Sequence, residues 1–234
     1  MIDIQKYQRA GVHILTRDDA RYPEKLSTIE YPPDPLFVKG NVEAVNNTGI
    51  AIVGMLEASK AGQAIAYRMA AFFAEQGYTI VSGLALGIDA AAHEGALSVG
   101  GQTVCVLAGG LKEAAPRQNA GLADRILASG GAWVSEKELD IQPDRSMFVP
   151  RNRIQVGLSA CSIVVECNAR SGTMTHAQYC VAAGHPLFAV APEDEDNKLG
   201  LSCDGPRVMI ERMGAQPVVS KVCYQRILSS IKGI

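Results

Sequence analysis

Residues 77–110 read GYTIVSGLALGIDAAAHEGALSVGGQTVCVLAGG and predict a complete strand–helix–strand unit. The apolar run 78–81 predicts a strand, and a glycine-containing turn leads from it into residues 88–98. That stretch is rich in alanine, the strongest helix former, and it is followed by two glycines, which stop helices. A second apolar run, 102–107, predicts the next strand. The segment is therefore a βαβ unit with two parallel strands.

The same alternation of apolar run, glycine turn and amphipathic stretch continues on both sides of this unit. Runs such as IAIV at 50–53 and SIVVE at 162–166 lack polar alternation, which is typical of parallel strands covered by helices on both faces. We therefore predict an α/β fold with a doubly wound parallel sheet, an extended Rossmann-like fold. Further strands are predicted at 132–134, 187–190 and 216–219, and further helices at 60–76, 119–129, 152–159, 172–183, 206–213 and 221–231.

Residues 1–49 differ from the rest because four prolines interrupt the pattern. The short run LFVKG at 36–40 predicts an edge strand that leads into the core. We predict an N-terminal extension, 1–49, packed on a Rossmann-like domain, 50–234. That domain also carries two long loops, at 136–150 and 192–203, and the EDED run at 193–196 in the second predicts a solvated acidic turn.

The composition is that of a globular protein, with 47% hydrophobic and 20% charged residues among 234. The net charge of -2 gives no general attraction to a phosphate backbone, so a nucleic-acid site must be a local cluster. The six cysteines form no CxxC pair and the four histidines are scattered, so we expect neither a metal site nor a cofactor. An N-terminus without an apolar signal segment, and no run long enough to span a membrane, favour a cytoplasmic location with no membrane partner.

In open parallel sheets, ligands bind where strand ends lead into helix N-termini. Small residues recur at these predicted ends, and glycine lets backbone N–H groups approach an anion closely. Two interpretations are open: each glycine simply makes a tight turn, or the turns together hold a phosphate or nucleotide-like ligand. The candidates are Gly54, Ser82, Gly83, Gly109, Arg170, Ser171, Gly172, Thr173 and Thr175.

The segment FVPRNRIQVGLS, 148–159, places Arg151 and Arg153 at a predicted helix start. Arginine forks suit phosphate oxygens, but ordinary solvated arginines on a surface helix explain the spacing equally well. Phe148 either stacks on a base or anchors its loop to the core.

Asp89 and His93 lie four residues apart and share a helix face, which permits an acid–base pair but favours a local hydrogen bond that fixes the helix start. Glu166, at a strand end, is the other carboxylate able to do chemistry. The GxSxG, HExxH, GxxxxGK[ST] and GxGxxG motifs are all absent. The sequence thus carries no hydrolase, zinc-protease, P-loop or standard dinucleotide-binding fingerprint.

Several blocks together resemble the DprA/Smf family over roughly residues 20 to 220. The most specific are VSGLALGIDAAAH, RNR followed by GLS, and VVE with SGTMT, in that order. The resemblance implies an extended Rossmann-like fold, a single-stranded DNA site at the strand ends, a homodimer, and delivery of DNA to a RecA-type recombinase. It also implies a protein with no catalytic residue and no enzyme activity. By position it assigns ligand-facing roles to Gly54, Ser82, Gly83, Arg151, Asn152, Arg153, Ser171, Gly172, Thr173 and Thr175, and it places Lys39 near the same edge.

The chain departs from the family pattern in the block AGGLK, where the family has GTGLD, in Ala115-Pro116, where it has YP, and at two positions where an arginine is lost. Leu56 stands where the family commonly has the arginine of VGSR, and Leu86 stands where it has the arginine of SGLARGID. Three functions are open: a single-stranded DNA-binding accessory protein of recombination or natural transformation, a protein that binds a nucleotide or nucleotide-derived ligand, and a protein-interaction module. The PGGxGT motif of phosphoribohydrolase-like enzymes is missing, which argues against glycosidic hydrolysis.

Overall fold

One sheet runs through the part of the chain that the computed structural model describes, residues 2–192 and 196–231, and it has nine strands. Their order is β1-β2-β6-β5-β4-β3-β7-β8-β9. Seven are parallel to one another, as predicted: β3 (Gly49–Val53), β4 (Thr79–Ser82), β5 (Thr103–Val106), β6 (Ala132–Ser135), β7 (Ser159–Val164), β8 (Leu187–Val190) and β9 (Gln216–Val218).

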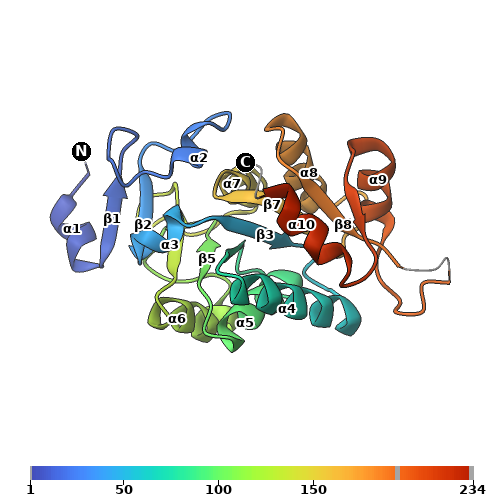
Figure 1. The fold of residues 1–234 in the computed structure, drawn as a ribbon. Coiled ribbons are helices and arrows are strands. Elements are labelled where there is room, and N and C mark those ends of the chain that lie inside the picture. The colour runs from blue at the N-terminus through green and yellow to red at the C-terminus, as the bar shows by residue number, and fades with distance from the viewer. Residues whose placement is uncertain (1, 193–195, 232–234) are drawn as a thin grey trace.

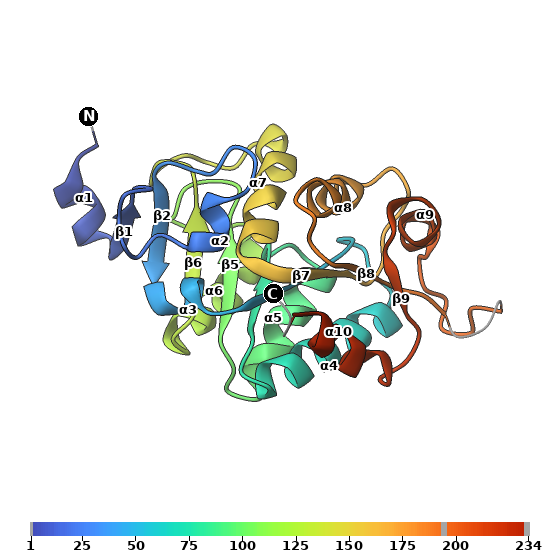
Figure 2. The ribbon, with the colours of Figure 1, turned by 45° about the horizontal axis from the view of Figure 1, so that its top comes forward.

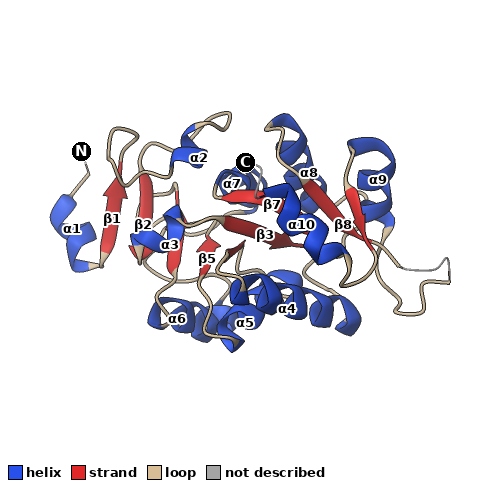
Figure 3. Ribbon diagram, in the orientation of Figure 1, coloured by secondary structure: helices blue, strands red, loops and turns tan. Residues whose placement is uncertain are grey.

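Helices cover both faces of this sheet, which confirms the doubly wound α/β fold (Figures 1 and 2). The helices of one face are α4 (Lys60–Glu75), α5 (Ile88–Ser98), α6 (Ala120–Ala128) and α10 (Cys223–Ile231), and those of the other are α7 (Arg145–Gly157), α8 (Gly172–Ala182) and α9 (Asp204–Met213). The described residues also form the short helices α1 (Ile4–Arg9), α2 (Glu24–Ser27) and α3 (Val42–Asn46) (Figure 3) and the 3-10 turn Arg117–Asn119.

Helix α4 shows why these segments fold as they do. The Ser59 hydroxyl caps it by accepting a hydrogen bond from the Gly62 N–H at 2.9 Å. Ala66, Met69 and Phe73 fall on one face at helical spacing, and all three are buried against the sheet. The neighbouring α5 packs against α4 so closely that a side chain at Gly95 would overlap the backbone of α4.

The structure corrects the prediction of an edge strand at LFVKG. β2 (Leu36–Gly40) lies inside the sheet, because β1 (Val12–Leu15) pairs with its outer side. Both strands run antiparallel to their neighbours, and β2 joins the parallel part by pairing with β6. Residues 1–49 thus extend the same sheet by two strands.

The structure also corrects the predicted loop at 136–150, because its last residues are helical. Helix α7 begins at Arg145, seven residues before the predicted start. The Asp144 carboxylate caps it by accepting a hydrogen bond from the Ser146 N–H at 2.9 Å. Pro150 lies in the second turn, where it removes one backbone hydrogen bond without ending the helix. Seven more residues of ordered helix therefore reach the carboxyl edge of the sheet. In the second predicted long loop, residues 193–195 of the acidic turn lie outside the described residues.

Candidate functional site

The direction of the chain through the sheet reverses between β3 and β7. β4, β5 and β6 follow on one side of β3, whereas β7, β8 and β9 follow on the other. A ligand site is expected beyond the strand ends at such a switch point. A cleft of about 550 Å³ opens there, lined by Val53, Gly54, Met55, Leu56, Glu57, Ala85, Asp89, Arg145, Phe148, Val149, Arg151, Asn152, Gln155, Asn168, Ser171, Gly172, Thr173 and His176.

The N-terminus of α8 forms one wall of the cleft and has room for an anion. Ser171 is the N-cap residue, but its side chain makes no capping hydrogen bond. Gly172 is exposed, and a Cβ atom there would meet only the Val149 side chain, at 3.4 Å. The Thr173 hydroxyl donates to the Gly54 carbonyl at 3.4 Å and so ties this wall to the end of β3. The first N–H groups of α8 therefore face the cleft together with the positive end of the helix dipole.

Arg151 lies under the cleft as a buried cation, only 5% exposed. Its Nη1 donates to the Val106 carbonyl at 2.7 Å, and its Nε has no hydrogen-bond partner among the described residues. With the Gln155 amide oriented by its hydrogen bonds, the amide oxygen accepts from Arg151 Nη1 at 2.9 Å and the nitrogen donates to His176 Nδ1 at 3.3 Å. Burial lowers the pKa of Arg151, and the nearby Asp89 opposes this shift.

Asp89 and His93 do not form an acid–base pair. Asp89 Oδ2 accepts a hydrogen bond from the Gly83 N–H at 3.1 Å, which fixes the turn before α5 as the sequence favoured. His93 Nδ1 contacts Thr103 Oγ1 at 2.6 Å instead, and burial lowers the His93 pKa to about 3. Burial raises the pKa of Asp89, while the charge of Arg151 acts in the opposite direction. This polar cluster supports the shape of the cleft.

Glu166 likewise has a structural role. Its carboxylate is fully buried and accepts hydrogen bonds from the Ser59 N–H at 2.9 Å and the Ser202 N–H at 2.8 Å. These bonds hold the segment before α4 and the segment before α9 to the end of β7. The carboxylate is thus occupied by backbone donors.

The cleft brings together seven of the fourteen residues that the sequence proposed for the site: Gly54, Phe148, Arg151, Asn152, Ser171, Gly172 and Thr173. Phe148 is 40% exposed, so its ring is available at the cleft instead of anchoring the loop in the core. Asn152 Nδ2 donates to the Gly172 carbonyl at 3.3 Å, which joins α7 to α8 across the cleft floor.

Three of the proposed cations lie elsewhere. Lys39 is on the antiparallel β2, with its ammonium 4.7 Å from the centre of the Trp133 ring and 3.4 Å from the Leu111 carbonyl. Arg153 points to another face of α7, where it forms an ion pair with Glu136 and donates to the Tyr31 carbonyl at 2.8 Å. Arg170 is exposed in the turn before α8, outside the cleft lining.

The remaining four proposed residues are packed against other parts of the chain or lie in turns. The Ser82 hydroxyl donates to the Ile52 carbonyl at 2.7 Å, and a side chain at Gly83 would overlap the Arg151 guanidinium. Gly109 lies against the backbone of Ile141, and Thr175 is half-buried in the first turn of α8. They lie next to the cleft without lining it.

The sequence interpretation missed two charged residues of the cleft, Arg145 and Glu57. Arg145 occupies the first turn of α7, where a cation is unfavourable for the helix dipole. Asp144 before it is a favourable N-cap residue, but Pro150 is a helix breaker and therefore favoured a later helix start in the sequence interpretation. Leu56, which the family resemblance placed where an arginine is common, also lines the cleft and is 59% exposed.

Among residues 2–192 and 196–231, no cluster of three or more His, Cys, Asp or Glu side chains is arranged to hold a metal ion. In the same part of the chain, no helix is both long and apolar enough to cross a membrane.

The fold and cleft define a Rossmann-like α/β protein with an anion-compatible site at the switch point of a parallel sheet. Residues 13–229 match the family described as DNA recombination-mediator protein A, and the chain belongs to that family. This match confirms the family resemblance drawn from the sequence blocks.

Curated relatives agree with this assignment. Protein Smf of Escherichia coli is 40% identical over 179 residues, which are 76% of this chain and 48% of the relative. DNA processing protein DprA of Bacillus subtilis is 33% identical over 215 residues, covering 92% of this chain and 70% of the relative. The chain thus spans about half the length of the Escherichia coli protein.

Solved structures show the same architecture. DprA from Streptococcus pneumoniae superposes with a TM-score of 0.83 at 33% identity, over 97% of this chain and 78% of the other. DNA processing protein A from Helicobacter pylori, described with a single-stranded DNA binding mode, gives 0.80 at 26% identity, over 95% and 96%. A molybdenum cofactor carrier protein from Chlamydomonas reinhardtii gives 0.53 at 15% identity, which shows a shared fold alone.

Proposed function

We propose that the chain binds single-stranded DNA in the cleft between β3 and β7. In this role it is a non-enzymatic accessory protein of recombination or natural transformation, which acts as a homodimer and delivers DNA to a RecA-type recombinase. The observation that carries the DNA site is the open N-terminus of α8 at Gly172, in the same cleft as Arg145 and the exposed ring of Phe148. The named DprA relatives support the biological context.

The cleft offers complementary groups to the two parts of a nucleotide. A phosphate at Gly172 gains backbone N–H donors and the positive end of the α8 dipole. A base gains stacking or apolar contact with Phe148 and Leu56, which both line the cleft. Arg145 adds a cation at the surface, and Glu57 offsets part of that charge.

The replacement of the family's arginine by Leu56 favours one alternative. An apolar side chain at the cleft lip reduces the charge available to successive phosphates, so a single nucleotide or nucleotide-derived ligand fits the same cleft. Fluorescence anisotropy with a dT oligonucleotide and thermal shift with a nucleotide panel separate the two. A melting temperature raised by a nucleotide, with unchanged oligonucleotide anisotropy, would select the alternative.

The central test is Gly172→Asp, which places a carboxylate at the mouth of the cleft. A side chain fits there without overlap, and an acid in the first turn of a helix stabilises it, so the fold should persist. Two like charges about 4 Å apart repel by about 1 kcal/mol in water and about 4 kcal/mol near a protein surface. The affinity for a dT oligonucleotide should therefore fall at least about fivefold, measured by anisotropy at two salt concentrations.

Two control variants isolate the cause. Gly121→Asp adds the same acid to α6 at another open helical glycine and should leave the affinity unchanged. Gly172→Asn adds a side chain of the same size without charge and should cost less than Gly172→Asp. A folded Gly172→Asp protein, verified by circular dichroism, that binds as tightly as the parent would remove the cleft from the proposed function.

A further inference from the structure

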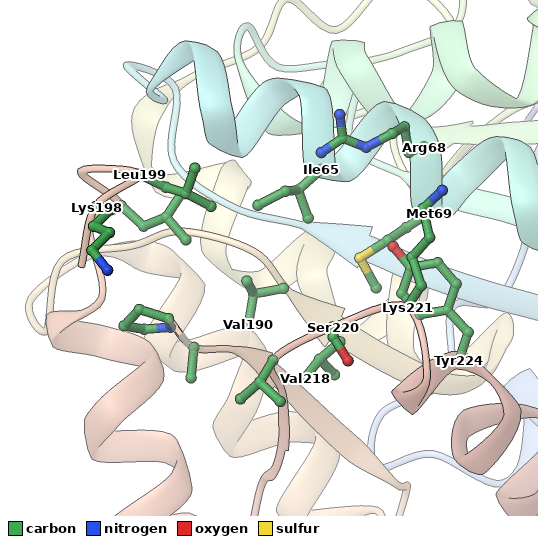
Figure 4. A pocket seen from close by; sticks show the side chains of 14 residues that line it. Ile65, Arg68, Met69, Val190, Lys198, Leu199, Val218, Ser220, Lys221 and Tyr224 are labelled. Carbon is green, nitrogen blue, oxygen red and sulfur yellow. The ribbon is translucent and has the colours of Figure 1, made fainter. Parts of the chain in front are cut away.

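A second cavity, of about 540 Å³, lies at the carboxyl ends of β8 and β9, against α4 and α10 (Figure 4). None of its lining residues lines the cleft between β3 and β7. Its volume falls within the roughly 300–1,000 Å³ of small-molecule sites. It is therefore a candidate site in its own right.

The walls of this cavity form an apolar slot. Ile65 and Met69 of α4 face Val190 and Val218 at the two strand ends, and Tyr224 of α10 lies at one end of the slot (Figure 4). Opposed aliphatic side chains with an aromatic ring at the end suit a flat, ring-shaped group.

The charged side chains among the described residues that line this slot are all cations. Its charged side chains are Arg68, Lys198 and Lys221, and no Asp or Glu is among the described residues that line it. Lys198 lies at the end of the slot next to Leu199, and Lys221 at the other end next to Tyr224 (Figure 4). Arg68 and Lys221 are exposed and have no ion-pair partner within residues 2–192 and 196–231. The rim thus offers cations to an anion whose apolar part enters the slot.

We propose that this cavity binds a nucleoside phosphate, with the base in the slot and the phosphate at Arg68 and Lys221. An apolar ligand alone gives these cations no partner, and a simple anion leaves the apolar walls unfilled, so a ligand with both parts fits best. Arginine and lysine are the usual phosphate-binding cations of proteins. The site takes either a free mononucleotide or one nucleotide of a strand, and it does not depend on DNA binding in the cleft.

The experiment follows the Met69 methyl group by NMR of methyl-labelled methionine in the full chain. Met69→Leu, a volume-conserving change, identifies its signal among the seven methionines. Titration with dTMP should shift this signal saturably, whereas thymidine and inorganic phosphate, each carrying half of the chemistry, should bind more weakly. A dT oligonucleotide tests whether a strand reaches the site.

Charge reversal at the rim tests the phosphate contact. Lys221→Glu and Arg68→Glu should each weaken dTMP binding by about tenfold, because each replaces a charge-assisted hydrogen bond to the phosphate with repulsion. Lys25→Glu, an equal charge change on the distant helix α2, should leave it unchanged. Gly172→Asp should also leave the Met69 response intact, which separates this site from the cleft.

Four results would overturn the proposal. The first is that the Met69 signal does not respond to dTMP up to about 10 mM, a concentration that reveals even weak ligands. The second and third are that thymidine, or inorganic phosphate, binds as tightly as dTMP. The fourth is that Gly172→Asp abolishes the response of Met69 to dTMP. A negative result in the DNA-binding test at Gly172 would not contradict this second site, because the cavity and the cleft share no lining residue.

Discussion

Replacing Arg151 with methionine tests the claim that this arginine is a buried support of the cleft. Arg151→Met keeps an apolar chain of similar reach but removes the guanidinium that bonds the Val106 carbonyl and whose charge lowers the pKa of Asp89. Removing one of two interacting buried charges costs up to about 3–5 kcal/mol, the range for a buried ion pair, because the other charge is left uncompensated. We expect a loss of that size in the free energy of unfolding at about pH 8.

The pH dependence of this loss identifies Asp89 as its source. Burial raises the pKa of Asp89 above its unfolded value, and without the charge of Arg151 only hydrogen bonds from Ser82, Gly83 and Ala85 oppose that shift. As the pH falls through the raised pKa, the folded variant binds a proton that the unfolded chain does not yet bind, so the variant regains stability relative to the parent. The deficit should therefore shrink between about pH 8 and about pH 5.

The assay is urea unfolding followed by fluorescence of the single tryptophan, Trp133, which is buried in β6. Comparing variant and parent at each pH cancels the titration of groups that both share. Adding Asp89→Asn to Arg151→Met should recover much of the loss at about pH 8, since it removes the stranded charge. A deficit under about 1 kcal/mol, or one independent of pH, would refute a buried pair of this strength.

Two further predictions concern protonation and cleft charge. Burial lowers the pKa of His93 and of His176 to about 3. Between that value and about pH 6.5, the unfolded chain therefore binds a proton at each histidine that the folded chain does not bind. At about pH 5, each histidine should lower the free energy of unfolding by about 2 kcal/mol relative to neutral pH. Urea titrations of parent and His93→Gln measure this, and an unchanged pH slope in the variant would contradict it. Arg145→Ala should weaken oligonucleotide binding and reduce its salt dependence, while Glu57→Gln should strengthen binding by a few fold. Anisotropy at two salt concentrations measures both, and equal affinities for the two variants would refute the charge assignment.

The sequence predicts the helices and strands correctly wherever one local signal dominates, such as flanking glycines or a uniformly apolar run. The predicted helix 88–98 and strand 187–190 coincide with α5 and β8, since glycines bound the first and the second is uniformly apolar. β1 was missed because it is four residues long and only its two end residues are buried. The start of α7 was missed because Pro150 is a strong breaker signal, although the helix continues through it.

The sequence predicts the candidate site only in part, again where a local signal dominates. Glycine turns and the start of α8 follow from local sequence, but the direction of a cation depends on its helix face. Residues two apart on a helix point to different faces, so Arg151 and Arg153 cannot both meet one ligand. The structure uses one beneath the cleft and the other in an ion pair with Glu136, where the Arg153 side chain is 13% exposed.

This division of the arginines bears on what the cleft recognises. With leucine at position 56, Arg151 buried and Arg153 turned away, Arg145 is the cation at the cleft surface among the described lining residues, and Glu57 opposes it. The attraction for phosphate then comes mainly from the N–H groups and dipole at the start of α8, which are short-ranged and poorly suited to a long run of phosphates. Apolar contacts from Phe148 and Leu56 must supply a larger share of the binding than in a cleft lined by arginines. The proposed DNA site is therefore one that holds a nucleotide by its base and a single phosphate.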